Sequence, residues 1–354
     1  MKQDLARYHR QMLLPGFGET GQRRLLKSTA VVLGCGALGS VAADMLCRAG
    51  VGRLVIIDRD FVEITNLQRQ VLFDEQDIAD ALPKAEAARR KLQRINSGVE
   101  ITAIVDDINA GNIESFCAGA DVLLDGLDNF ETRYLANDVA VKHGIPYLYG
   151  GAVGTEGMAF AILPRIGKRP ATPCLRCLFG EAPPPGQAAT CDTVGVLGPV
   201  VATIANCQVA EALKILTGNL DQVSTGLLSI DLWNNSLLRL AVDRMDDLHD
   251  CPCCQQRQFD YLEGRAGSQA IALCGRDAVQ LRHRQQAEPL DLAAVARRLD
   301  GLGTARLNEF MLRVKLSEQG QDYELSLFRD GRAIIKGTAD PTVARSIYAK
   351  YVGN

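Results

Sequence analysis

The chain has 354 residues, of which 47% are hydrophobic and 23% are charged, as in an ordinary soluble globular protein. Its formal net charge of −3 offers no bulk electrostatic attraction to nucleic acid or to an anionic membrane. No apolar run reaches the roughly 18 uninterrupted residues of a membrane span, and the first residues lack the apolar core of a signal peptide, so we expect a cytoplasmic protein with no membrane or nucleic-acid partner.

The first half of the chain predicts alternating strands and helices. Residues 5–28 are predicted to be helical, with a glycine-rich interruption at 16–21. Strands are then predicted at 29–34, 53–58, 100–105, 121–125, 146–149 and 157–163. Helices are predicted from the first strand to residue 49 and at 84–95, 110–116 and 131–143. This alternation indicates an α/β fold with a doubly wound, mostly parallel Rossmann-like sheet.

A glycine-rich turn, Gly34-Cys35-Gly36-Ala37-Leu38-Gly39, lies between the first strand and the helix that follows it. Such a G-x-G-x-x-G turn binds phosphate because its backbone N–H groups and the helix N-terminus face the anion. Asp58 ends the second strand, where a carboxylate holds a ribose hydroxyl. We therefore expect the three glycines and Asp58 to bind a nucleotide, although these features alone fit NAD as well as ATP.

A cluster of polar side chains follows the second strand. It consists of Asp60, Asn66, Arg69, Gln70 and, at the start of the helix predicted at 84–95, Lys84. A dehydrogenase has no need of such a cluster, whereas a guanidinium, an amide and a lysine neutralise a triphosphate and its developing charge. Asp128 lies beyond the end of a strand, where it is placed to hold Mg²⁺ against the phosphates. The alternative for each charge alone is a solvated surface residue.

The segment at residues 180–195 is predicted to be a loop, because it is rich in proline, glycine and alanine and has little periodicity. Cys191 stands in this loop, where a thiol either reaches a bound partner or is inert. A long apolar helix is predicted at 199–216, with Pro199 near its start and Gly218 past its end. A further strand is predicted at 226–233.

Two Cys-x-x-Cys pairs, Cys174/Cys177 and Cys251/Cys254, predict one zinc site. Four thiolates leave Zn²⁺ with no open position, so the site is expected to be structural and to perform no chemistry. Cys253 lies inside the second pair, but the two-residue gap favours Cys254 as the ligand. The alternatives are four unrelated cysteines or two redox pairs.

The chain changes character after residue 255. Residues 1–255 are expected to form a nucleotide-binding domain that includes the zinc site. Residues 256–354 contain more arginine and more strand-like runs, and they end in a helix predicted near 341–351, so we expect a separate small α+β domain. Its residues indicate no chemistry, and we expect it to dock a partner or to steady a dimer.

Several motifs occur together along residues 5–255. They are R-Y-H-R-Q at 7–11, G-C-G-A-L-G at 34–39, I-D-R-D at 57–60, N-L-Q-R-Q at 66–70, P-K at 83–84, D-G-L-D-N-F at 125–130 and the two cysteine pairs. This set resembles the ThiF/MoeB/HesA family, which comprises bacterial relatives of the ubiquitin-activating enzymes. The stretch at 128–138 and the run L-C-G-R-D-A-V-Q at 273–280 most resemble its ThiF-type branch.

The resemblance implies an adenylyltransferase that acts on a small ubiquitin-fold sulfur-carrier protein ending in Gly-Gly. The carrier's C-terminal carboxylate attacks the α-phosphate of ATP·Mg²⁺, which gives an acyl-adenylate and pyrophosphate. Such chemistry needs positioning and positive charge rather than a strong base, because a carboxylate is already ionised at pH 7. The sequence supplies these two requirements and little else.

The family's functional residues fall on matching positions of this chain. The resemblance implies that Gly34, Gly36 and Gly39 line the phosphates and that Asp58 holds the ribose. It also implies that Asn66, Arg69 and Lys84 contact the phosphates and that Asp128 holds Mg²⁺. Asp60 and Gln70 are grouped with the nucleotide-binding residues. Arg10 resembles an arginine that the family supplies from the neighbouring subunit, so a homodimer is implied. Cys191 matches a loop cysteine that can form a covalent sulfur link with the carrier.

Two departures and several alternatives remain at this point. No rhodanese signature is present, so sulfur is expected from a separate donor. The chain ends at Asn354 rather than in Gly-Gly, so it is not expected to be the carrier. Thiamin thiazole synthesis is the favoured pathway, but molybdopterin synthesis or another sulfur pathway fits the same chemistry. An NAD-dependent oxidoreductase and a scaffold that only binds ATP or a partner are the alternatives of other classes.

Overall fold

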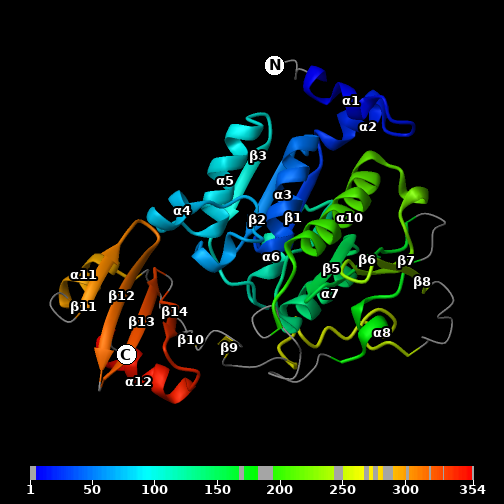
Figure 1. The fold of residues 1–354 in the computed structure, drawn as a ribbon. Coiled ribbons are helices and arrows are strands. Elements are labelled where there is room, and N and C mark those ends of the chain that lie inside the picture. The colour runs from blue at the N-terminus through cyan, green and yellow to red at the C-terminus, as the bar shows by residue number, and fades with distance from the viewer. Residues whose placement is uncertain are drawn as a thin grey trace. The chain divides into compact units, whose positions relative to one another are not determined.

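In a computed structural model of the protein, two compact units are seen (Figure 1). The structure describes residues 5–166, 171–181, 194–242, 250–266, 271–273, 278–281, 290–299, 303–318, 320–329 and 331–352. The larger unit comprises Met1–Pro183 with Gly195–Gly267, and the smaller contains Ser268–Asn354. Phe259, Tyr261 and Leu262 pack in the core of the larger unit. The domain boundary expected after residue 255 stays a prediction.

The larger unit is built on one eight-stranded sheet, with the strand order β3-β2-β1-β4-β5-β6-β7-β8. Its strands are β1 (Thr29–Leu33), β2 (Arg53–Ile57), β3 (Glu100–Ile104), β4 (Val122–Asp125), β5 (Tyr147–Val153), β6 (Glu156–Ile162), β7 (Gly226–Asp231) and β8 (Ser236–Ala241). The strands from β3 to β5 run parallel, and β6, β7 and β8 extend the sheet in antiparallel pairs. The predicted α/β fold with a mostly parallel, Rossmann-like sheet is confirmed.

Helices cover both faces of this sheet. They are η1 (Leu5–Tyr8), α1 (His9–Met12), α2 (Gly18–Leu25), α3 (Ala37–Ala49), η2 (Ile64–Asn66), α4 (Glu75–Ala79), α5 (Lys84–Ile95), α6 (Ile113–Cys117), α7 (Phe130–His143), α8 (Leu175–Phe179), α10 (Gly198–Thr217) and η3 (Leu220–Gln222). On one face, α3 and α10 pack side by side (Figure 1). Helix α3 covers β1, β2 and β4, and α10 covers β4, β5 and β6. On the other, α6 and α7 pack against β1, β4 and β5, and the core continues into both cysteine segments.

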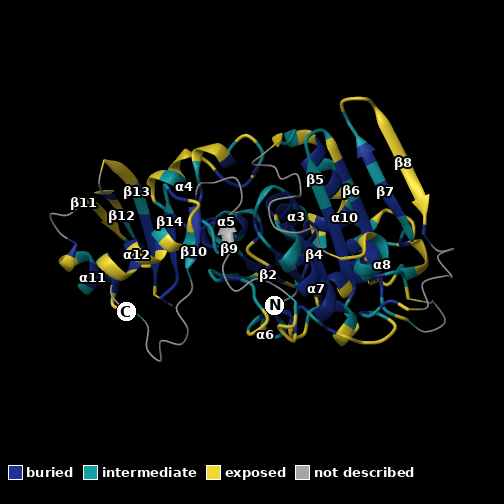
Figure 2. Cartoon of the chain, turned by 90° about the horizontal axis from the view of Figure 1, so that it is seen from below, coloured by how far each residue is buried: buried dark blue, intermediate teal, exposed yellow. Residues whose placement is uncertain are grey.

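Within the described residues, α10 is the one helix long and apolar enough to cross a membrane. Half of that stretch is buried inside the protein, where Val200, Val201 and Ile204 pack in the core. Pro199 stands in its first turn, and Gly218 ends the helix with a left-handed φ of 87°. In this fold, α10 therefore serves as a core helix of the sheet (Figure 2).

In its described residues, the smaller unit has an antiparallel sheet and two helices. Its strand order is β11-β12-β13-β14-β10-β9. The elements are β9 (Ile271–Leu273), β10 (Ala278–Leu281), α11 (Leu292–Arg298), β11 (Gly303–Leu307), β12 (Met311–Glu318), β13 (Gln321–Phe328), β14 (Ala333–Lys336) and α12 (Pro341–Tyr351). Val314, Leu325 and Ile335 lie beside one another on neighbouring strands and belong to the core that the sheet forms with its helices. The predicted small C-terminal α+β character is confirmed.

Candidate functional site

The glycine-rich loop joins β1 to the 13-residue helix α3. Gly34 has a left-handed φ of 86°, and a Cβ on it would lie 2.6 Å from the carbonyl oxygen of Gly126. A Cβ on Gly39, in the first turn of α3, would lie 1.9 Å from the carbonyl oxygen of Gly34. Neither position has room for a side chain, so the loop enters α3 tightly. The helix N-terminus there is suited to an anion because its first N–H groups have no partner in the helix.

Three parallel strands end at the same level beside this loop. In the register of the sheet, Leu33 at the end of β1 stands opposite Ile57 of β2 on one side and Asp125 of β4 on the other. The residues that follow these strand ends are Gly34, Asp58 and Gly126. The structure therefore brings together the glycine loop, Asp58 and the loop that leads to Asp128, at the edge where ligands bind in open α/β sheets.

Asp58 holds the glycine loop against β2. Its carboxylate accepts hydrogen bonds from the backbone N–H of Cys35 (2.6 Å) and from that of Asp60 (2.7 Å). Burial raises the pKa of Asp58, while the nearby Lys84 opposes this shift. The carboxylate thus lies directly beside the predicted phosphate loop, and its contact with a ribose stays a prediction.

Lys84 is buried in an ion pair. Its Nζ lies 3.2 Å from Oδ2 of Asp60, and only 3% of its side chain is exposed. Arg59 lies next to this pair and contacts Asp107 at 2.6 Å and Asp60 at 3.8 Å. Burial alone would lower the pKa of Arg59, but the carboxylates of Asp60, Asp107 and Asp128 raise it above its ordinary value. Asp128 therefore belongs electrostatically to the same group of charges.

Gln70 is buried beside the glycine loop and keeps one polar atom unpaired within the described residues. Its side chain is 3% exposed, and its Oε1 is buried with no hydrogen-bond partner within the described residues. Its Nε2 lies 3.9 Å from the position of a Cβ on Gly36, so the amide stands beside the glycine loop. A buried acceptor without a donor costs about 1–3 kcal/mol. A bound molecule with a donor group would remove that cost.

Asn66 and Arg69 are held by their own turn. Oδ1 of Asn66 accepts a hydrogen bond from the backbone N–H of Glu63 (3.0 Å) and caps η2. The Arg69 guanidinium donates to the carbonyl oxygen of Thr65 at 2.7 Å. The turn itself is close to the N-terminus of α10, because a Cβ on Gly198 would lie 4.0 Å from Cα of Arg69. Phosphate contacts of Asn66 and Arg69 stay predictions.

The remaining predicted residues are differently placed. Asp128 is exposed just beyond β4, and Nδ2 of Asn129 donates to its Oδ1 at 3.2 Å. Arg10 is exposed on α1, as an arginine that reaches another subunit would need to be. Cys191 lies outside the described residues. Sequence reasoning missed Arg59, although its position between Asp58 and Asp60 was a usable signal. It also missed the buried Arg133.

The four paired cysteines come together in the larger unit. Their sulfur atoms all lie within 4.8 Å of one another, and three Sγ–Sγ distances are 3.8 Å (Cys174–Cys177), 3.7 Å (Cys174–Cys251) and 3.4 Å (Cys177–Cys254). A tetrahedral site with Zn–S bonds of about 2.3 Å needs sulfur atoms about 3.8 Å apart. The donor set and its spacing therefore fit Zn²⁺. The neighbouring thiols of Cys177 and Cys251 lower the pKa of Cys174, whereas the contact with Cys174 raises the pKa of Cys177 and of Cys254.

Two buried side chains of α7 hold the cysteine segments in place. Asn137 accepts a hydrogen bond from the backbone N–H of Leu175 (2.9 Å) and donates to Sγ of Cys253 (3.3 Å). Asp138 accepts from the thiol of Cys253 (3.4 Å) and from the backbone N–H of Tyr261 (3.0 Å). Cys253 is thereby held by α7, and Cys254 is the fourth cysteine of the cluster. That Cys254 rather than Cys253 binds the metal stays a prediction.

Because of this geometry, replacing Cys253 and replacing Cys254 should have different effects on metal binding. We expect Cys253→Ser to keep close to one bound metal ion per chain, because a hydroxyl can replace the thiol between Asn137 and Asp138. Cys254→Ser should lose most of the metal, since three thiolates remain. Metal content by mass spectrometry after dialysis measures both. Equal losses in the two variants would contradict the ligand assignment.

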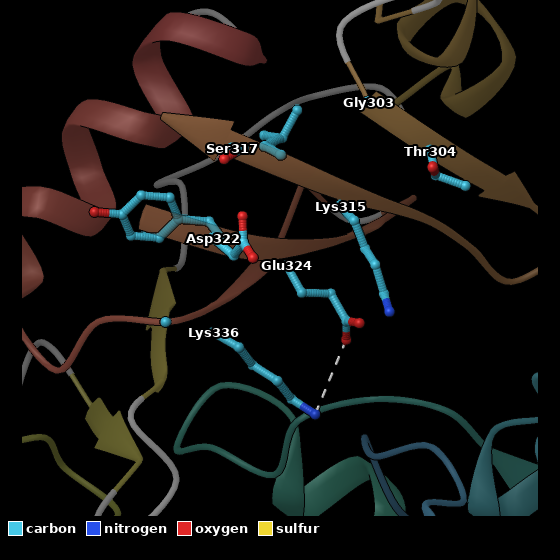
Figure 3. Close-up of a pocket in the computed structure, with 10 residues that line it drawn as sticks. Gly303, Thr304, Lys315, Ser317, Asp322, Glu324 and Lys336 are labelled. Carbon is cyan, nitrogen blue, oxygen red and sulfur yellow. Dashed lines mark ion pairs between the residues drawn. The ribbon is translucent and has the colours of Figure 1, made fainter. Parts of the chain in front are cut away.

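Each unit also has a cavity of its own. In the smaller unit, an open concavity of about 710 Å³ is lined by charged side chains of adjacent strands (Figure 3). Lys336 pairs with Glu324 across it at 4.0 Å. In the larger unit, a cavity of about 230 Å³ lies beside α10 and includes Gln208 in its lining. None of the predicted site residues lines either cavity.

Comparisons with known proteins show which family the chain resembles in sequence and fold. The model of the ThiF family matches residues 8–253. The chain is 44% identical over 349 residues to the sulfur carrier protein ThiS adenylyltransferase of Bacillus subtilis (strain 168), covering 98% of this chain and 99% of that one. It is 38% identical over 259 residues to the SAMP-activating enzyme E1 of Haloferax volcanii, covering 73% and 92%. A crystal structure of E. coli MccB with ATP shares the fold, with a TM-score of 0.56, 24% identity and coverage of 66% and 69%.

Proposed function

The chain belongs to the ThiF family, and from that premise we propose that it adenylates the C-terminal glycine of a ubiquitin-like sulfur-carrier protein. Relatives that it matches over two thirds or more of its length are named as adenylyltransferases of sulfur-carrier proteins. The observation that carries the proposal is the meeting of the glycine loop, Asp58 and the loop before Asp128 at one edge of the sheet, in a chain that matches such a relative over 98% of its length.

The reaction transfers AMP to a carboxylate. An oxygen of the carrier's C-terminal carboxylate forms a bond to the α-phosphorus of ATP. The bond from that phosphorus to the oxygen bridging to the β-phosphate breaks, and pyrophosphate leaves with its electron pair. No proton must be removed, because the carboxylate is already ionised near pH 7. The protein therefore has to position the two reactants and to stabilise charge on the phosphates.

The residues present fit ATP. The tight glycine loop and the N-terminus of α3 suit the phosphates. The buried Oε1 of Gln70 offers an acceptor for a hydroxyl or amino group of the nucleotide. Asp58 would hold the ribose. Lys84, which forms an ion pair with Asp60, would face the phosphates. Asn66 and Arg69 would contact the phosphates from the neighbouring turn. Mg²⁺ bound with ATP would neutralise phosphate charge, with Asp128 as its protein ligand.

The finer assignments follow the same reasoning. We assign Zn²⁺ to the four-cysteine site as a structural metal, because the thiols leave no open position. Arg10 is assigned to the neighbouring subunit's site in a homodimer, and Cys191 to a covalent sulfur link with the carrier. The carrier ends in Gly-Gly, and a separate donor supplies sulfur. Thiamin thiazole synthesis in the cytoplasm is the proposed setting, supported by the relative named for ThiS.

Isotope exchange tests this proposal directly. With purified protein, ATP, Mg²⁺ and a Gly-Gly-ended carrier, labelled pyrophosphate should enter ATP, and the rate should depend on the carrier. A carrier that lacks its last glycine is the matched control and should give no exchange. The absence of exchange with both ThiS-type and MoaD-type carriers would contradict the proposal. Reduction of NAD in the presence of candidate substrates would instead favour an oxidoreductase.

A further inference from the structure

A buried ion pair lies directly under the loop that carries Asp128. Asp125 is the last residue of β4, and its side chain is fully buried beside Arg133 of α7, with 3.2 Å between Nε and Oδ2. The hydroxyl of Tyr147 donates to the same carboxylate at 2.8 Å. A charged pair in the interior is expensive to bury, so its presence beneath a functional loop calls for a role.

This pair also holds the backbone of the loop. Oδ1 of Asp125 accepts a hydrogen bond from the backbone N–H of Leu127 (2.9 Å). Nη2 of Arg133 donates to the carbonyl oxygen of Leu127 (2.7 Å) and to that of Gly150 in β5 (3.2 Å). Both backbone polar groups of Leu127, the residue before Asp128, are therefore fixed by buried side chains.

The other end of the loop is fixed as well. Nε2 of Gln208 in α10 donates to the carbonyl oxygens of Asp125 (2.9 Å) and Leu148 (2.7 Å). Gly126 is packed so closely that a Cβ on it would lie 2.3 Å from the carbonyl oxygen of Gly34 in the phosphate loop. The path from β4 to Asp128 thus has one conformation, set against the phosphate loop.

We propose that Arg133, acting with Asp125 and Tyr147, is a positioning residue that sets where the Asp128 carboxylate meets the metal–nucleotide complex. The inference rests on the proposed function of Asp128 and extends it to side chains that do not touch the substrate. Residues that orient a metal ligand change metal affinity or activity by about 10- to 100-fold when they are replaced. A purely structural arginine changes stability alone.

The charge of the Arg133 guanidinium supports this role. Burial alone would lower the pKa of Arg133, but the carboxylate of Asp125 and, more weakly, that of Asp128 raise it above its ordinary value. The guanidinium is therefore charged, with the carboxylates of Asp125 and Asp128 in its surroundings. Its stacking against the rings of Phe130 (5.7 Å) and Tyr149 (5.6 Å) restricts the guanidinium further.

The test measures carrier-dependent ATP–pyrophosphate exchange as a function of Mg²⁺ concentration and, without the carrier, the Mg²⁺ dependence of ATP binding by calorimetric titration. Arg133→Lys keeps the charge but loses the fork that reaches Leu127 and Gly150. We expect the Mg²⁺ concentration for half-maximal exchange to rise about 10- to 100-fold. Tyr147→Phe removes one hydrogen bond to Asp125 without changing charge or shape, and it should shift the same midpoint by about 2- to 10-fold. This milder variant keeps the test decisive if Arg133→Lys does not fold.

Arg176→Lys is the matched control. Arg176 is also a buried arginine with two carboxylate partners, Asp260 (2.9 Å) and Glu181 (2.6 Å), but it lies in the cysteine segment. It should lower the melting temperature without moving the Mg²⁺ midpoint. An unchanged midpoint in Arg133→Lys and Tyr147→Phe, or an equal shift in Arg176→Lys, would overturn the positioning role. Failure of the wild-type protein to catalyse exchange would instead count against the proposed function.

Discussion

Replacing Asp128 with alanine should lower carrier-dependent ATP–pyrophosphate exchange by about 10²- to 10³-fold, the usual effect of removing one group that stabilises charge in a transition state. Asp128 is exposed beyond β4, so its removal creates no cavity, and the melting temperature should change little. If Asp128 holds Mg²⁺, the variant should also require a higher Mg²⁺ concentration for half-maximal exchange. Exchange kinetics and a thermal melt of the same preparation measure these effects.

Two further variants make this result specific. Asp221→Ala removes an exposed carboxylate from η3 in the same unit and should leave the exchange rate unchanged. Arg69→Ala should lower the rate as Asp128→Ala does, because it removes positive charge from the predicted phosphate site. Wild-type rates in both Asp128→Ala and Arg69→Ala would show that the assignment of this site is wrong, even if the protein is an adenylyltransferase.

The fold of the larger unit could be predicted closely where local signals agree. Strand β1, the glycine turn and helix α3 were predictable because a β-branched run, three glycines and an amphipathic pattern follow one another. Helix α6 was predicted less well, because it begins at Ile113 rather than at residue 110. The side chains of Asn109 and Asn112 bond to nearby backbone groups there, which favours a turn over a helix.

Strand β8 was missed although its turn signal is in the sequence. Asp231 accepts hydrogen bonds from the backbone N–H of Trp233 (3.0 Å) and Asn234 (3.3 Å), and Asn235 has a left-handed φ of 52°. This turn ends β7 at Asp231 and starts a hairpin, whereas the predicted strand continued to residue 233. The β8 residues are exposed along the whole strand, so no alternation of buried and exposed side chains marks it (Figure 2).

For the candidate site, the predictable part is the set of residues that follow strand ends. Asp58 and Asp128 stand there because the chain order and the parallel sheet bring strand ends to one edge. The contacts that hold them are tertiary and leave no local pattern. Arg133 lies within α7 and Gln208 within the apolar helix α10. The hydrophobic periodicity of these helices does not distinguish either residue from its neighbours. Only the packed structure shows that they meet the backbone of one loop.

Removal of the metal should lower the melting temperature by about 8–20 °C. The site joins two segments 77 residues apart in sequence. A crosslink that closes a loop of that length contributes about 4–5 kcal/mol in the chain-entropy model, and 1 kcal/mol corresponds to about 2–4 °C for a domain of this size. Calorimetry before and after treatment with a chelator, with metal content measured on each sample, checks this. Cys207→Ser, which changes a cysteine outside the cluster, should shift the melting temperature much less.

Metal removal should change ATP affinity less than it changes stability, because the two sites use different parts of the sheet. The cysteines pack on the face covered by α6 and α7, whereas the glycine loop lies at the strand ends and opens α3 on the other face. One structural link remains: Asn137, which holds the cysteine segment, and Arg133, which holds the Asp128 loop, are one turn apart on α7. Calorimetric titration of the metal-free protein with ATP at 25 °C distinguishes a purely structural metal from one that is needed for ATP binding. A loss of ATP binding in protein that is still folded would mean that the metal belongs to the nucleotide site, which would contradict a purely structural role.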